Sequence, residues 1–176
     1  EYLTVTRTIG ASANMYAWFF VDTGDTTAYF DGATAYEMIT PTSWTLDGAG
    51  TVTERESALV KSDTYSVRLK SVSAASSIYN SLSAPTTYRS KTLNLGGWVY
   101  SSSPSQARIS LYDDVLGFSY SDYHSGNSTW EYLTVSKDIS ATATILRVTC
   151  HIPTGSRTAY FDSVYLSYLG TLQVTG

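Results

Sequence analysis

Cysteine, histidine and clustered positive charge are all scarce in this 176-residue sequence. The single cysteine, Cys150, excludes an internal disulfide and a zinc site built from cysteines. The 11 lysines and arginines are scattered singly and the net charge is −4. Nucleic acids and anionic membranes favour clustered basic residues, so neither is an expected partner. No apolar run approaches the roughly 20 residues that a membrane-spanning helix needs, and no membrane span is predicted.

Signals of catalysis are scarce as well. Only two histidines occur, His124 and His151, and the sequence has no nucleophile-elbow, zinc-protease or P-loop motif. A pair of catalytic carboxylates is a spatial arrangement that sequence does not reveal. The acidic residues, however, fall mainly in turn sequences, where solvated carboxylates are ordinary. The chain is therefore predicted not to be an enzyme.

Short alternating segments dominate what is present, while helical periodicity is nearly absent. Tyr65–Ser71, Ala107–Asp113 and Ile145–Pro153 each alternate apolar and polar residues, as half-buried antiparallel strands do. Tyrosine is abundant at 15 copies and is accompanied by many serines and threonines. Tyrosine and threonine suit pleated surfaces, so most of these tyrosines are interpreted as strand residues.

Turn sequences separate these strands. They are predicted at residues 47–50, 95–97, 101–105, 124–127 and 153–156. Many short strands at this spacing predict an all-β sandwich or barrel.

Two pentapeptides occur twice. "EYLTV" stands at Glu1–Val5 and Glu131–Val135, and "TAYFD" stands at Thr27–Asp31 and Thr158–Asp162. The repeat distance of about 130 residues is the size of one domain. Residues 1–37 therefore match the closing strands of an upstream or neighbouring unit. A complete unit is predicted at 38–168, followed by a C-terminal strand or linker at 169–176.

Residues 1–37 require a partner, because two or three terminal strands do not bury a hydrophobic face alone. Their segment "NMYAWFFV" is apolar on both faces. The partner is the rest of an upstream repeat, a neighbouring subunit that accepts strands, or the flank of the 38–168 sandwich. The residues expected to make this assembly contact are Met15, Trp18, Phe19, Phe20, Tyr29 and Phe30.

The order of motifs within 38–168 resembles a known superfamily. An early Trp in "PTSWTLDGAG" is followed by "DTYSVRLKS", "LGGWVY", "TWEYLTVS" and the closing "SRTAYFDSVYL". This series resembles the jelly-roll carbohydrate-binding modules of the family 4, 9 and 22 type, which are galactose-binding-like. The resemblance implies a jelly-roll β-sandwich of two antiparallel sheets. Similar modules occur as appendages of polysaccharide-degrading enzymes and as repeats in surface or virion proteins, so an extracellular, cell-surface or virion location is expected.

The same resemblance implies a structural calcium near the ends of the domain, and no other cofactor. The Asp of the closing strand is Asp162 here, and Glu37 is the expected acidic partner. The usual "YFDDV" reads "YFDSV" in this chain, with Ser163 in place of the second Asp, which weakens the inference. The alternative is that Asp162 binds backbone amides at a strand end.

Sugar binding needs aromatic faces that stack on pyranose rings, flanked by planar polar groups that bind hydroxyls. The strands expected to form the concave sheet carry such residues on their outward side. The candidates are Arg108, Tyr112, Tyr120, Tyr123, Arg147 and His151. The alternative is a solvated sheet face with extended Tyr and Arg side chains. Trp44, Trp98 and Trp130 occupy scaffold positions of the resemblance and are interpreted as core residues.

Two functions follow. The first is a non-catalytic structural or adhesive repeat of an extracellular filament, surface fibre or virion fibre, whose partners are neighbouring copies. The alternative is a glycan-binding module, whose partner is a polysaccharide and which is appended to a polysaccharide-degrading enzyme or adhesin.

Overall fold

The computed structural model describes residues 37–38, 44–48 and 52–168, all within one compact unit, Ala35–Gly176. Eleven strands and one short 3-10 helix occur in this part of the chain. They are β1 (Glu37–Met38), β2 (Thr45–Asp47), β3 (Val52–Glu56), β4 (Ser66–Ser71), β5 (Ser76–Ser81), η2 (Pro85–Tyr88), β6 (Thr92–Tyr100), β7 (Arg108–Asp113), β8 (Gly117–Tyr120), β9 (Trp130–Asp138), β10 (Leu146–Ile152) and β11 (Arg157–Tyr168).

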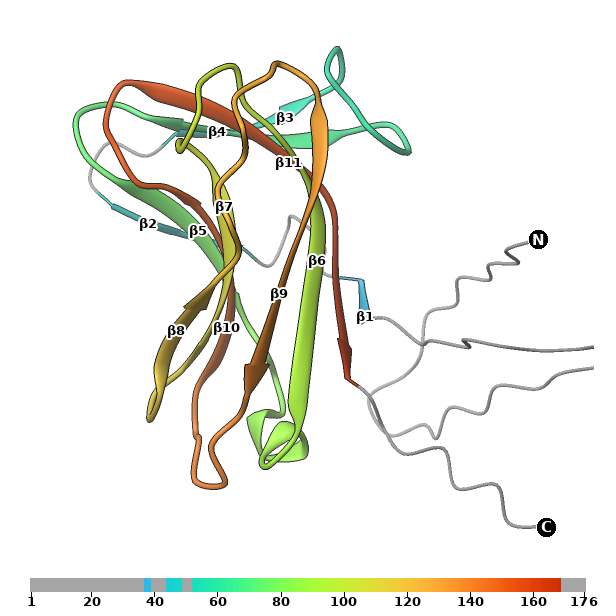
Figure 1. Cartoon of the computed structure of the whole chain (residues 1–176), viewed down its shortest axis with the longest axis vertical. Helices are drawn as coiled ribbons and strands as arrows, with labels where there is room; N and C mark the ends of the chain where they lie inside the picture. Colours follow the sequence, from blue (N-terminus) through green and yellow to red (C-terminus); the bar gives the residue numbers. More distant parts are fainter. Residues whose placement is uncertain (1–36, 39–43, 49–51, 169–176) are drawn as a thin grey trace, which may run out of the picture. The chain divides into compact units, whose positions relative to one another are not determined.

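The strands form two antiparallel sheets (Figure 1). Sheet A has the order β3-β4-β11-β6-β9, and β1 also pairs with β11. Sheet B has the order β2-β5-β10-β7-β8. Successive strands cross from one sheet to the other: β4 lies in sheet A, β5 in B, β6 in A and β7 in B, and β9, β10 and β11 again alternate. This crossing between two packed sheets is the jelly-roll sandwich that the sequence predicts.

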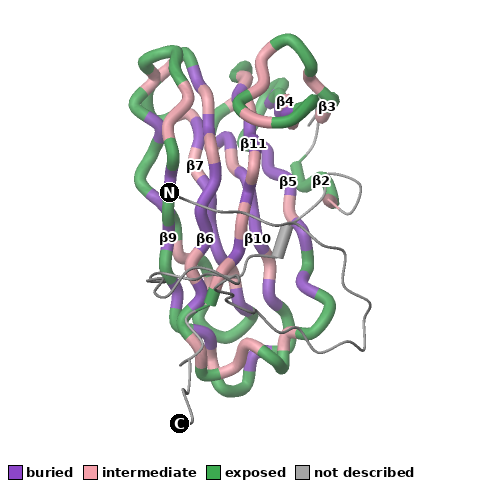
Figure 2. Tube along the Cα trace, turned by 90° about the vertical axis from the view of Figure 1, so that its right-hand side faces the viewer, coloured by how far each residue is buried: buried purple, intermediate pink, exposed green. Residues whose placement is uncertain are grey.

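The core lies between the sheets and follows from the alternation. Leu69 on β4, Ile109 on β7 and Val148 on β10 have no exposed surface, and Phe161 on β11 is 2% exposed. Along β7 and β10 the predicted inward residues are buried, whereas Arg108, Tyr112, Arg147 and His151 are half-buried, as the predicted faces require. Ser110 and Thr149, which the alternation predicts to face outward, are buried as well. Figure 2 shows the buried residues of both strands. Cys150 also faces the core, where burial raises the pKa of its thiol.

Glycines at 95–97 do not make the turn that the sequence predicts. Gly96 and Gly97 lie inside β6, paired with Thr134 and Leu133 of β9. Glycine is favoured here because neighbouring side chains lie close to the backbone. A Cβ on Gly97 would lie 3.1 Å from Cγ2 of Val164. Glycine inside a strand often marks such a close approach. The turn prediction at this position is therefore wrong.

A buried ion pair joins the two sheets. Lys137 on β9 of sheet A is 6% exposed, and its Nζ lies 3.3 Å from Oδ2 of the fully buried Asp113 on β7 of sheet B. The other carboxylate oxygen of Asp113 accepts hydrogen bonds from the Val115 and Leu116 amides. Burial alone raises the pKa of Asp113, but these hydrogen bonds and Lys137 outweigh it and hold the pKa below its usual value.

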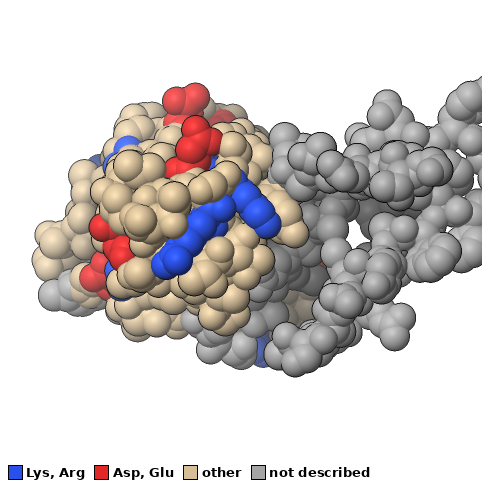
Figure 3. All heavy atoms as spheres, turned by 90° about the horizontal axis from the view of Figure 1, so that it is seen from below, with Lys and Arg blue, Asp and Glu red and all other residues tan. Residues whose placement is uncertain are grey.

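Basic side chains gather at the end of the sandwich seen from below (Figure 3). Near η2, Arg89 donates from Nε to the Ala143 carbonyl oxygen at 2.7 Å, and the Lys91 Nζ lies 4.6 Å from the centre of the Tyr168 ring. These two cations hold the β9–β10 loop and the end of β11, so they serve the fold. Among the described residues, no helix is long and apolar enough to cross a membrane.

Candidate functional site

Register in sheet B places the candidate residues side by side on its outer face. Strand β10 pairs with β7 so that Arg147 stands opposite Tyr112, and His151 stands opposite Arg108. Strand β8 continues the same face, with Phe118 opposite Tyr112. Their neighbours in sequence point into the core, because side chains alternate across a strand. Residues that are 35 and 43 positions apart in sequence therefore share one surface.

Arg108 lies against two tyrosines. Its guanidinium carbon is 3.6 Å from the centre of the Tyr120 ring and 4.5 Å from that of Tyr123. Its Nε is buried and has no hydrogen-bond partner among the described residues. Cation–π contact holds the guanidinium flat against the rings and leaves its terminal N–H groups as directed donors.

Arg147 is held in the same way on the next strand. Its guanidinium carbon lies 4.5 Å from the centre of the Tyr79 ring and 5.6 Å from that of Tyr112. The Nε of Arg147 is likewise buried without a partner among the described residues. Two arginines fixed over tyrosine rings thus make this face positive.

His151 stands opposite Arg108 and beside two of the aromatic rings. Its Nε2 is 2.7 Å from the Ser110 hydroxyl, and its ring centre lies 5.3 Å from that of Tyr120 and 5.7 Å from that of Phe118. Burial, together with the positive charge of Arg108, lowers the pKa of His151 to about 4. The imidazole is therefore neutral at pH 7, so the positive charge of the face comes from its arginines.

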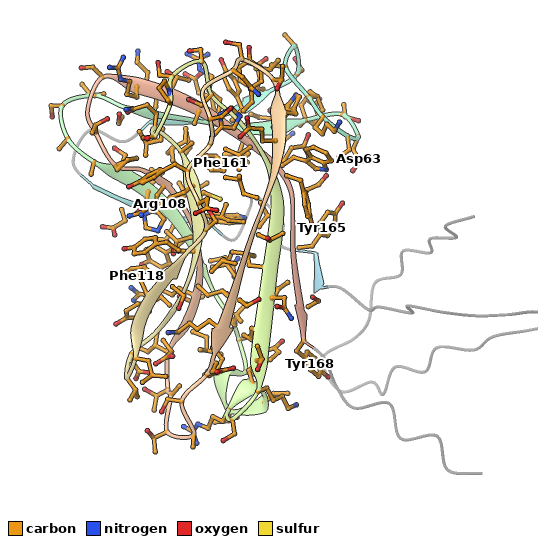
Figure 4. The ribbon with its side chains drawn as sticks, viewed as in Figure 1. Asp63, Arg108, Phe118, Phe161, Tyr165 and Tyr168 are labelled. Carbon is orange, nitrogen blue, oxygen red and sulfur yellow. The ribbon has the colours of Figure 1, made fainter. Side chains whose placement is uncertain are left out.

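Three aromatic rings lie beside this cluster, and two of them, Phe118 and Tyr120, are exposed. Phe118 and Tyr120 are stacked, with ring centres 5.4 Å apart and planes 16° apart, and Tyr112 lies 4.7 Å from Phe118. Phe118 is 44% and Tyr120 41% exposed, although both are large and apolar. Figure 4 shows Phe118 and Arg108 projecting from the same side of the sandwich.

Sequence reasoning missed Phe118 and Tyr79. The two-residue alternation along a strand could have identified both. Phe118 stands two residues before the candidate Tyr120, and Tyr79 follows the inward Ile78. Alternation alone would have placed both on the outer face. The six candidates named from the sequence all lie in or beside the β7, β8 and β10 part of this face.

His124 has a different role. It is 1% exposed; its Nδ1 accepts a hydrogen bond from the Gly126 amide at 2.8 Å, and its Nε2 contacts the Thr129 carbonyl oxygen at 2.9 Å. Because Nδ1 is the acceptor, Nε2 carries the proton and donates to Thr129. This histidine therefore shapes the loop that precedes β9.

The tryptophan interpretation is corrected for two of three residues. Trp44 packs against the core as expected. Trp98 and Trp130 instead lie on the outer face of sheet A. The ring centre of Trp98 lies 5.2 Å from that of Tyr132, and the ring centre of Trp130 lies 5.8 Å from that of Tyr100. Their positions alternate with inward residues such as Val99 and Leu133, which leaves them outside the core.

Asp162 is surrounded by donors. Its Oδ2 accepts from the Lys61 and Ser62 amides at 2.8 and 3.0 Å, and its Oδ1 accepts from the Ser62 and Ser163 hydroxyls at 3.3 and 3.0 Å. A cation would need oxygen ligands here, and amide N–H groups point at the carboxylate instead. The two amide hydrogen bonds are those that the alternative of backbone binding expects.

Glu37, the expected partner of Asp162, lies on β1 opposite Leu166 of β11, and its side chain is outside the described residues. Among the described residues, no group of three His, Cys, Asp or Glu side chains is arranged to hold a metal. Calcium binding stays a prediction. The predicted assembly residues Met15, Trp18, Phe19, Phe20, Tyr29 and Phe30 also lie outside the described part of the chain.

No protein-family model and no curated protein matches this sequence. Solved structures do match. The first family 22 module of Xyn10C from Paenibacillus barcinonensis, a xylan-binding domain, has a TM-score of 0.61 and 14% identity over 80% of this chain and 99% of that one. TmCBM61 in complex with β-1,4-galactotriose has a TM-score of 0.51 and 12% identity, covering 70% of this chain and 86% of that one.

A viral protein shares the fold too. The enzymatically active domain of tailspike protein 4 from bacteriophage CBA120 has a TM-score of 0.56 and 12% identity, over 73% of this chain and 20% of that one. The chain has the jelly-roll fold of carbohydrate-binding modules, as its motifs predict.

Proposed function

We propose that this chain is a glycan-binding module that holds a polysaccharide on the outer face of sheet B. The observation that carries the proposal is the pair of arginines held on tyrosine rings beside the exposed, mutually stacked rings of Phe118 and Tyr120. Sugar rings present C–H faces that stack on aromatic rings, and hydroxyls that accept from guanidinium N–H groups. This face offers both.

The similar solved structures support this function better than the fibre repeat that the sequence places first. Their ligands include xylan and β-1,4-galactotriose. Both are chains of pyranose units, for which a row of rings and donors along strands β7, β8 and β10 is suited. Extracellular polysaccharide is the proposed partner, and an extracellular or virion location is proposed with it.

Affinity electrophoresis in xylan and in β-1,4-galactan tests the proposal. We expect Arg108→Ala and Tyr112→Ala each to weaken retention about tenfold, because each removes a fixed planar group from the face. Arg68→Ala and Tyr160→Ala are matched controls from the outer face of sheet A and should leave sheet B binding unchanged. Equal retention of all four variants, or no retention of the wild type in any polysaccharide, would contradict the proposal.

A second candidate rests on the internal repeat. "EYLTV" and "TAYFD" recur about 130 residues apart, so residues 1–37 match the closing strands of the unit that follows. We propose that such units assemble in a filament or fibre through residues 1–37, with neighbouring copies as partners. A fibre repeat that also binds glycan is compatible with both candidates.

Light scattering and electron microscopy of the full chain test the second candidate. We expect concentration-dependent oligomers that are lost in Trp18→Ser combined with Phe20→Ser, because these residues belong to the segment that is apolar on both faces. A chain that stays monomeric at every concentration would exclude assembly and leave glycan binding unaffected.

A further inference from the structure

The outer face of sheet A carries a second aromatic set, on the side of the sandwich opposite Arg108 and Phe118. Figure 4 shows Tyr165 projecting from that side. The rings come from β6, β9 and β11, where register places Trp98 between Tyr132 and Asp162, and Tyr100 between Trp130 and Tyr160. None of these residues belongs to the site on sheet B.

A groove lies over Gly96, between two tyrosines of this set. Gly96 stands opposite Thr134 on one side and Tyr165 on the other. The Tyr132 phenol lies directly over the glycine, because a Cβ there would be 2.1 Å from its hydroxyl oxygen and 2.7 Å from Cζ. Tyr132 packs on the strand at this point and is 47% exposed, so a large part of its side chain is accessible to a ligand.

The groove is small and its lining is uncharged. Its volume is about 280 Å³, and its lining is Asn94, Leu95, Gly96, Tyr132, Thr134, Val135, Ser136, Tyr165 and Ser167. Pockets for drug-sized molecules begin at roughly 300 Å³, so this groove has room for about one sugar ring. An anion would find no cation in this lining. A ligand with a flat C–H face and several neutral hydroxyls would find an aromatic wall and hydroxyl and amide partners.

Neighbouring side chains hold the aromatic wall in place. Trp98 meets Tyr132 edge to face at 5.2 Å and 61°, and the Lys61 Nζ lies 4.1 Å from the centre of the Trp98 ring. Ser136 donates to the Asn94 side-chain oxygen, which orients the Asn94 amide nitrogen as a donor. The wall and one polar group of the groove are therefore preorganised.

The geometry points to a second glycan site, in which a single neutral pyranose unit stacks on Tyr132 over Gly96 and hydrogen-bonds to Asn94 and Thr134. This site lies on the opposite sheet and stands independently of the site on sheet B. It makes the module bivalent toward polysaccharide, which raises its avidity for chains without requiring tight binding at either face.

Titration of the full chain with methyl β-xyloside, methyl β-glucoside and methyl β-galactoside, followed by amide NMR, tests the site. We expect saturable shifts at Gly96 and Thr134 for at least one glycoside, with a dissociation constant in the millimolar range. Tyr132→Ala should weaken this binding about tenfold by removing the stacking ring. Gly96→Ala should weaken it comparably, because the new Cβ displaces the flexible end of Tyr132.

Two controls keep this test separate from the site on sheet B. Tyr160→Ala removes an aromatic ring from the same face outside the groove lining, and Tyr112→Ala removes one from the opposite face. Both should leave the Gly96 and Thr134 shifts unchanged. The site is overturned if no glycoside shifts these amides up to high millimolar concentration, or if folded Tyr132→Ala and Gly96→Ala bind like the wild type. Loss of binding in Tyr112→Ala alone would support only the site on sheet B.

Discussion

The two outer faces of this sandwich are built by the same alternation and carry different chemistry. On sheet B, Arg108 and Arg147 lie on tyrosine rings, and among the described residues neither forms a salt bridge. On sheet A, Arg68 is paired with Glu54 at 2.9 Å, and the lysine over Trp98 is Lys61. Sheet A also has ring-stacked cations, since the Arg55 guanidinium carbon lies 4.8 Å from the centre of the Tyr65 ring. The faces differ in that sheet A carries an arginine–carboxylate pair, whereas Arg108 and Arg147 of sheet B have none among the described residues.

This difference distinguishes a structural arginine from a binding one. Arg68 has a terminal nitrogen on the Glu54 carboxylate, although its Nε, like those of Arg108 and Arg147, is buried without a hydrogen-bond partner among the described residues. The stacked arginines have no carboxylate on their terminal N–H groups. The tyrosines differ in the same sense. Tyr79, Tyr112 and Tyr120 lie under the cations, whereas Tyr132 lies on a glycine and is 47% exposed.

The strongest way to break the comparison is to separate the sheets. Lys137→Met leaves the fully buried Asp113 without its cation. We expect a loss of about 3–5 kcal/mol in the free energy of unfolding, because an unpaired buried carboxylate is strongly destabilising. Urea unfolding measures this loss, with Lys70→Met, at an exposed position of β4, as the control. A loss below about 1 kcal/mol would show that Asp113 is stabilised by its amide hydrogen bonds alone.

Lowering the pH affects the two faces differently, because His151 on sheet B becomes protonated. The folded pKa of His151 is lowered to about 4 from 6.5, so the unfolded chain takes up the proton first as the pH falls. The stability from neutral His151 is fully present above about pH 6.5 and is lost between there and pH 4. The loss approaches about 3 kcal/mol.

Urea midpoints measured from pH 7 to pH 4.5 in wild type and His151→Asn check this. The variant lacks the titrating group, so its midpoint should change much less across the window. Parallel curves for the two proteins would show that His151 is not the group responsible.

Local alternation was enough to predict part of the molecule. The outward positions of Arg108, Tyr112, Arg147 and His151 follow from strands whose inward residues are plainly apolar, such as Ile109 and Val148. Which residues meet across paired strands depends on the strand register, and the register is not evident from the sequence. The contact of Arg147 with Tyr79 joins residues that are 68 positions apart, and no local pattern reports it.

The errors have the same origin. Gly96 and Gly97 look like a turn in the sequence. Glycine is needed at these positions because the Tyr132 ring and the Val164 side chain, which come from other strands, approach the backbone closely. Trp98 and Trp130 are large and apolar, so size favoured the core. Their register, opposite Tyr132 and Tyr100, places them on the outer face instead. Packing between distant strands overrides composition at all four positions.

A smaller effect is expected from a substitution that tests whether the planar guanidinium group or only the positive charge of a sheet B arginine matters for polysaccharide binding. Arg147→Lys keeps the positive charge and removes the planar fork that lies between Tyr79 and Tyr112. On the proposed function, we expect polysaccharide binding to weaken by about 1 kcal/mol, roughly fivefold, because lysine stacks less well and lacks the fork. Affinity electrophoresis measures it, and unchanged retention would mean that charge alone suffices.

The smallest effect is expected on sheet A, at its surface ion pair. Arg68 and Glu54 have side chains that are 34% and 49% exposed, so water screens their attraction. We expect Glu54→Gln to lower the free energy of unfolding by no more than about 0.5 kcal/mol, with less effect in high salt. A double-mutant cycle with Arg68→Ala isolates the pair in urea unfolding. A coupling energy above about 1 kcal/mol would contradict this expectation. It would mean that the Arg68–Glu54 pair stabilises the β3–β4 edge more than an exposed ion pair normally does.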